Sequence, residues 1–129
     1  MSWRRLATAA LAIGLMMTMT KHAGAFSAAF SWAGIRACEK ISPAFRLSAV
    51  PAGTQQLRFA MVDLDVPTFR HGGSTINYGG EAVGQGAVSY IGPCPPAGQR
   101  HRYRWTIEAL DAGGKVLATA TATDLFPPK

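Results

Sequence analysis

The sequence feature that most constrains the fold is a pair of segments with strand periodicity, joined by a short turn. Side chains alternate from Arg102 to Leu110: Tyr103, Trp105, Ile107 and Ala109 fall on one side, and Arg104, Thr106 and Glu108 on the other. A period of two is typical of a strand with one face in the core. The turn sequence 111–114 contains two glycines, and residues 116–123 return as a segment rich in β-branched side chains. This part of the chain is therefore predicted to be a β-hairpin.

The rest of residues 26–129 shows short apolar segments separated by Gly and Pro turns. Residues 45–50, 56–62, 75–78 and 86–90 are predicted strands. In 56–62 both sides are largely apolar, which predicts a central strand covered on both faces. No segment after residue 25 has the period of a helix, and no repeat or linker divides it. The pattern favours one all-β domain, a sandwich or a barrel.

The first 25 residues are predicted to be a secretory signal peptide. Arg4 and Arg5 precede an uncharged, mostly apolar stretch from residue 6 to 20, and Ala23-Gly24-Ala25 offers small residues to a signal peptidase. Roughly 15 apolar residues fall short of the ~20 that a spanning helix needs, which argues against a membrane anchor. The chain is thus predicted to be exported, to the periplasm or the medium, as a domain of residues 26–129 without a membrane span.

The charge gives little support to a nucleic-acid partner. The whole chain has 13 basic and 7 acidic residues, but the predicted leader removes three of the basic ones, Arg4, Arg5 and Lys21. Arg100, Arg102 and Arg104 form the one notable basic cluster, and strand alternation places them on a single face, opposite His101. Such a face is typically solvated, so no nucleic-acid partner is predicted.

Cys38 and Cys94 are the only cysteines in the sequence. In an oxidising compartment an even pair usually forms a disulfide. Neither has another Cys or His nearby at the spacing of a zinc site. We predict a Cys38–Cys94 disulfide that ties the loop around Cys94 to the N-terminal segment.

Candidate functional side chains gather where predicted strands begin or end. Asp63 and Asp65 follow the segment 56–62 and precede His71, and His101 follows a loop stiffened by prolines. Imidazoles and carboxylates that converge at strand ends, with backbone N–H groups near glycines, would make a small polar pocket suited to an anion. The alternative is structural, because Asp-x-Asp before a turn often forms an Asx-turn.

A catalytic use of these side chains needs a nucleophile, and none stands in a recognisable setting. Ser74 and Ser89 lack the Gly-x-Ser-x-Gly pattern, and both cysteines are assigned to the disulfide. Two histidines and two aspartates are suitable metal ligands, but their spacing is not that of a known metal motif. We predict a binding protein, not an enzyme, with no metal and no cofactor.

The motifs also resemble those of a known family. In chain order these are Cys38, Ser42-Pro43, Pro51-Ala52-Gly53-Thr54, Met61-Val62-Asp63-Leu64-Asp65-Val66-Pro67, Tyr90-Ile91-Gly92-Pro93-Cys94-Pro95-Pro96 and His101-Arg102-Tyr103. Together they are similar to the phosphatidylethanolamine-binding protein (PEBP) family, whose bacterial branch is called Raf-kinase-inhibitor-like. The resemblance covers about residues 38 to 110. It implies a small antiparallel β-sandwich with a shallow anion pocket at one end.

Members of this family bind phosphate groups, including phospholipid headgroups. The resemblance therefore implies a phosphate-bearing small molecule or a lipid headgroup as the partner. The ligand-binding positions that it implies are Asp63, Tyr90, Gly92, Pro93 and His101, with His71 as the candidate second histidine. Asp65 and Pro67 would shape the loop without touching the ligand.

The sequence departs from the family pattern in three places. His71 is followed by two glycines where the family has a tryptophan, Leu64 stands where proline is common, and the chain stops at Lys129, without the C-terminal helix of longer members. We therefore expect a more open and weaker site.

For the pocket we expect both histidines to donate to the phosphate, while Asp63 sets their tautomer or accepts from the ligand. Because histidine ordinarily titrates near pH ~6.5, affinity for an anion should rise as the pH falls through that region. Some family members inhibit proteases or kinases, so the alternative prediction is a protease inhibitor or another protein-interaction module on the same fold.

Overall fold

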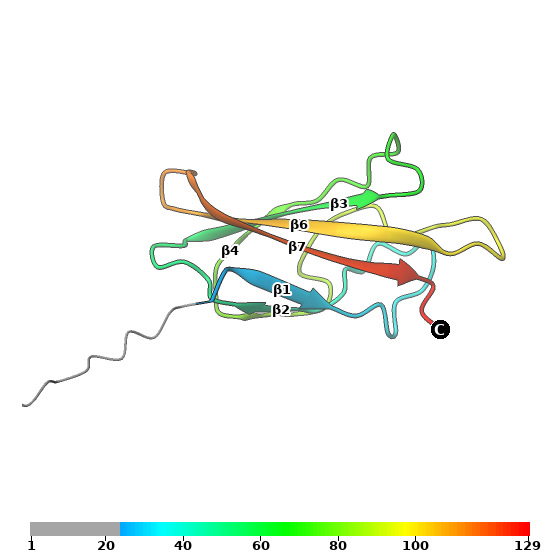
Figure 1. Cartoon of the computed structure of the whole chain (residues 1–129), viewed down its shortest axis with the longest axis horizontal. Helices are drawn as coiled ribbons and strands as arrows, with labels where there is room; N and C mark the ends of the chain where they lie inside the picture. Colours follow the sequence, from blue (N-terminus) through cyan, green and yellow to red (C-terminus); the bar gives the residue numbers. More distant parts are fainter. Residues whose placement is uncertain (1–23) are drawn as a thin grey trace, which may run out of the picture.

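The computed structural model describes residues 24–129, and all the regular structure in that part of the chain is β-strand (Figure 1). The strands are β1 (Ser27–Phe30), β2 (Phe45–Ser48), β3 (Gln56–Asp63), β4 (Thr75–Asn77), β5 (Ala82–Val83), β6 (His101–Leu110) and β7 (Val116–Phe126). They form two antiparallel sheets, β1-β2-β5 and β4-β3-β6-β7. The predicted antiparallel β-sandwich is confirmed. The predicted signal peptide lies almost entirely outside the described residues.

The predicted hairpin is β6 with β7, and it is the longest pairing in the structure. Its register pairs His101 with Phe126 at one end and Leu110 with Val116 at the other. Burial alternates along β6 as the sequence predicts, with Tyr103 and Trp105 inside and Arg102 and Arg104 exposed.

The prediction that β3 is covered on both faces is wrong. Leu57, Phe59 and Met61 are buried, but Arg58 and Ala60 are exposed. A sandwich has only two layers, so the outer face of each sheet meets solvent even where its side chains are small and apolar.

The smaller sheet differs more from the sequence prediction. Residues 86–90 form no strand, and β2 pairs instead with the two residues of β5. The segment near 88 is nevertheless fixed, because the Val88 N–H donates to Ser42 Oγ at 3.1 Å. Strand β1 was not predicted, since its small side chains carry no clear period.

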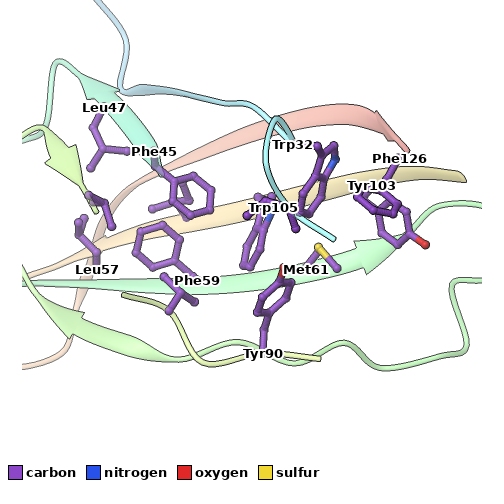
Figure 2. Packing of buried hydrophobic residues seen from close by; sticks show 14 of the residues in the cluster. Trp32, Phe45, Leu47, Leu57, Phe59, Met61, Tyr90, Tyr103, Trp105 and Phe126 are labelled. Atoms are coloured by element: carbon purple, nitrogen blue, oxygen red, sulfur yellow. The ribbon is translucent and has the colours of Figure 1, made fainter. Parts of the chain in front are cut away.

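Aromatic side chains from both sheets and their connections form the core (Figure 2). Phe45 of β2 meets Trp105 of β6 edge-on, with ring centroids 5.1 Å apart, and Trp32 meets Tyr103 in the same way at 5.9 Å. Edge-to-face packing is favourable for aromatic pairs in this distance range. The core therefore extends to Tyr103, which pairs with Asp63 at the end of β3. The loops after β3 and before β6 lie at this same end of the sandwich (Figure 1).

Candidate functional site

A cavity of about 350 Å³ lies where β3 ends and β6 begins. Its lining residues are Asp63, Val66, Phe69, His71, Ile91, Gly92, Cys94, Pro96, His101 and Tyr103. The antiparallel register places Asp63 opposite Tyr103, and His101 lies two residues before Tyr103 on the same inner face. Ordinary strand pairing therefore delivers three polar side chains to one place.

Asp63 and His101 form a buried pair at the floor of the cavity. The distance from Asp63 Oδ2 to His101 Nδ1 is 2.7 Å, and the residues are 4% and 8% exposed. The other carboxylate oxygen, Oδ1, accepts the backbone N–H groups of Asp65 and Val66. Burial by itself raises the pKa of Asp63, but the hydrogen bonds from His101 and the two backbone N–H groups outweigh it, so this pKa lies below its ordinary value. Asp63 is thus a carboxylate at neutral pH.

His71 is the second histidine of the cavity, and it is 4% exposed. Its Nδ1 donates to the carbonyl oxygen of Ile91 at 2.7 Å, while the Ile91 N–H donates back to the His71 carbonyl at 2.8 Å. An isolated bridge pairs Arg70 with Val62 of β3. Because side chains alternate in extended chain, this bridge turns the residues on either side of Arg70 toward the inner side of the sheet.

The partners of the two histidines fix where each ring carries its proton. A carboxylate and a carbonyl oxygen only accept hydrogen bonds, so Nδ1 bears hydrogen in both His101 and His71. A neutral ring then has an unprotonated Nε2, which is an acceptor. Nε2 becomes a donor only when the ring is protonated. The expectation that Asp63 sets both tautomers is therefore corrected: it does so for His101, and the Ile91 carbonyl does so for His71.

Tyr103 is a lining residue that the sequence analysis did not assign to the site. Strand alternation placed it in the core, where its ring does lie, but the residue also reaches the cavity. Burial, and then the nearby Asp63 carboxylate, raise the pKa of its hydroxyl. The hydroxyl therefore keeps its proton at physiological pH and remains able to donate.

Tyr90 and Pro93 do not line this cavity. The Tyr90 hydroxyl donates to the Ile41 carbonyl at 3.0 Å, its ring packs on Trp105, and burial raises its pKa to about 12. Pro93 is fully buried, and its carbonyl accepts the N–H of Cys38. Asp65 is also outside the cavity: its Oδ2 accepts the Arg102 N–H at 2.7 Å, which fits a loop-shaping role.

Gly92 lines the cavity and lies extremely close to the N-terminal segment. A Cβ at this position would be 1.7 Å from the carbonyl oxygen of Glu39, so only glycine permits this approach. The predicted Cys38–Cys94 disulfide is present beside it and is confirmed, with the two Cα atoms 4.5 Å apart. The contact at Gly92 and the disulfide together hold one wall of the cavity in place.

The mouth of the cavity is apolar, which the sequence analysis did not anticipate. Val66, Phe69 and Ile91 line it while remaining 41%, 50% and 46% exposed. The sequence did carry a signal for this apolar mouth, because the loop after β3 contains large apolar side chains among otherwise polar ones. These side chains would become buried only if a ligand or a protein partner covered them.

Two further properties concern residues 24–129 as a whole. No cluster of three or more His, Cys, Asp and Glu side chains is placed to hold a metal ion in this part of the chain. A search of the same residues for a helix long and apolar enough to cross a membrane finds none.

Fold and cavity together define an antiparallel two-sheet protein with a histidine–aspartate pocket at its strand ends. A model of the family described as "Phosphatidylethanolamine-binding protein" matches residues 71–126, which include His71, Gly92 and His101. No curated protein matches the sequence significantly.

Two crystal structures of bacterial proteins share the fold. YbcL of Escherichia coli, described as a new member of the mammalian PEBP family, has a TM-score of 0.55 and 20% identity, over 82% of this chain and 100% of its own. A PEBP homologue from Chlamydia trachomatis, CT736, gives 0.51 and 20%, over 81% and 99%. The family match and the shared fold confirm the resemblance to the phosphatidylethanolamine-binding protein family.

Proposed function

We propose that this protein is an exported binding protein that holds a phosphate-bearing small molecule or a lipid headgroup, without turning it over, in the pocket of Asp63, His71 and His101. The observation that carries the proposal is the tethering of both histidines at Nδ1, with 2.7 Å contacts to Asp63 and Ile91. Each ring is thereby held in one orientation, and its Nε2 is left for exchangeable partners.

Protonation makes this pair of rings suitable for an anion. When protonated, each imidazole offers Nε2–H as a charge-assisted donor, and such bonds to phosphate oxygens are stronger than neutral ones. The Tyr103 hydroxyl supplies a neutral donor close by. The Asp63 carboxylate balances the charge of the His101 imidazolium, so the pocket need not hold an isolated buried cation.

The proposal is tested by NMR titration of the protein with O-phosphoethanolamine at pH 6, in wild type and in His101→Ala. Saturable shifts at Asp63, His71, Gly92 and His101, lost in the variant, are the expected result. The folded state of the variant is verified from unchanged amide signals of the distant β6–β7 turn. Absence of any shift in the wild type at millimolar ligand would refute a phosphate pocket.

The apolar mouth favours a second candidate, a protein-interaction module such as a protease inhibitor. Val66 and Phe69 lie on the loop after β3, where a partner could cover them. Here Phe69→Ser should abolish inhibition of a susceptible protease, whereas His101→Ala should leave inhibition intact. The phosphate-binding proposal expects the opposite ranking of these two variants in the ligand titration.

Export is the part of the proposal that depends on residues 1–25. The sequence predicts cleavage before Phe26. Mass spectrometry of protein recovered from the periplasm or the medium should find Phe26 as the first residue, with Cys38 and Cys94 oxidised. Recovery of the uncleaved chain from the cytoplasm would contradict export.

A further inference from the structure

The side chain of Gln99 is hydrogen-bonded to the ring nitrogen of His101 that the proposed function needs. Its Oε1 lies 3.0 Å from His101 Nε2, while His101 Nδ1 is held by Asp63. Both ring nitrogens are therefore engaged within the protein. His71 differs, since no hydrogen-bond partner of its Nε2 is found among residues 24–129.

A glutamine can satisfy His101 in either protonation state. When the ring is protonated, Nε2–H donates to Gln99 Oε1. When the ring is neutral, the amide turns over and its NH₂ group donates to the Nε2 lone pair. The interaction therefore persists as the pH changes, unlike a bond to a carboxylate. Asp63 from β3, Tyr103 from β6 and His71 from the loop after β3 are the other titratable groups lining the cavity with His101.

The backbone of Gln99 is fixed, so only its side chain can move easily. The Gln99 N–H donates to the Pro96 carbonyl at 3.0 Å, and Gly98 takes the positive φ of 79° that closes this turn. The side chain is exposed and also lines a neighbouring groove of about 290 Å³, together with Gly98, Phe126 and Pro127. This groove shares Pro96 with the pocket. The groove therefore has room for the Gln99 side chain when that side chain leaves His101.

We propose that Gln99 is a latch on the pocket: its amide binds His101 Nε2 in the free protein, and an anion must displace it to reach both histidines. This inference rests on the proposed phosphate site and adds a residue that sets its affinity. When binding requires an open latch, the apparent affinity is the intrinsic affinity multiplied by the fraction of molecules in which the latch is open. An anionic oxygen can displace the amide because its bond to an imidazolium is charge-assisted on both sides.

The test compares three variants by titration with O-phosphoethanolamine at pH 6. Gln99→Ala removes the competing amide and should tighten binding by about tenfold, since a hydrogen bond to a charged group is worth on the order of a factor of ten. Gln99→Glu installs an internal carboxylate against His101 and should weaken binding by about tenfold or more. Gln56→Ala, an exposed glutamine at the start of β3, is the matched control and should bind as wild type does.

The outcomes separate the latch from the phosphate site itself. Equal affinity of wild type and Gln99→Ala would overturn the latch and leave the phosphate site standing. Weaker binding by Gln99→Ala would also overturn it, because the glutamine would then be a ligand contact. If no variant binds, both the site and the latch are refuted. In the wild type, movement of the Gln99 side-chain amide signals on saturation is the direct signature of displacement.

Discussion

Asp63 shows at the scale of one residue how the pocket is kept charged. Its oxygens accept three hydrogen bonds, one from His101 and two from backbone N–H groups. They keep its pKa low in spite of burial. A carboxyl group whose pKa is lower in the folded than in the unfolded state stabilises the fold above its unfolded pKa, and that contribution disappears as the pH falls through the folded pKa.

Asp63→Asn should therefore destabilise the protein most at neutral pH. We expect a loss of about 2 kcal/mol at pH 7, the order of a hydrogen bond to a charged group. The difference in free energy of unfolding between this variant and the wild type should shrink as the pH falls below about 4, the ordinary pKa of aspartate. Urea unfolding at pH 7, 5 and 3 measures it, with the exposed Asp124→Asn as control. A gap that stays constant or grows on acidification would contradict the assigned charge of Asp63.

Residue types and motif order could predict Asp63, Gly92, His71 and His101 as pocket residues. They could not give the tautomer of His71, because the Ile91 carbonyl that fixes it is a backbone group and carries no sequence motif. Tyr103 was assigned to the core alone, since strand alternation marks a buried face without showing where that face meets a cavity.

At the scale of elements, the loop before β6 depends on close contact with the segment that contains Cys38. Gly92→Ala should force this contact apart, because its Cβ would meet the Glu39 backbone. We expect overpacking to lower the free energy of unfolding by about 2 kcal/mol or more, and phosphate binding to become weaker. Gly79→Ala, where a Cβ meets no atom within 4 Å, is the control and should change neither unfolding midpoint nor binding. Wild-type behaviour of Gly92→Ala would show that the loop is not held in this way.

Strand periodicity was informative where one face of a long strand is buried, as in β3 and β6. It failed on β1, whose side chains carry no clear period, and on β5, which has only two residues. The wrong prediction that both faces of β3 are covered has a different cause. Ala60 and Val62 are apolar, but only the number of layers decides whether an apolar side chain is covered.

At the scale of the whole molecule, the Cys38–Cys94 disulfide links the segment after β1 to the pocket wall. Its sequence separation is 56 residues, and closing a loop of this length in the unfolded chain is worth about 4 kcal/mol on the entropic model. The double variant Cys38→Ser/Cys94→Ser should lose stability of this order, measured by urea unfolding. Reductant should lower the unfolding midpoint of the wild type and leave that of the double variant unchanged. Equal stability of the two proteins under oxidising conditions would contradict this role.

We propose an anion pocket in which two tethered histidines donate from Nε2 only when they are protonated. Its most direct test is the affinity for inorganic sulfate, whose own charge is constant between pH 5 and 8, measured by calorimetry in wild type. We expect the affinity for sulfate to rise as the pH falls from 8 to 5, and His71→Gln to make this pH dependence shallower. Affinity that is flat from pH 5 to 8, or that falls on acidification, would contradict it.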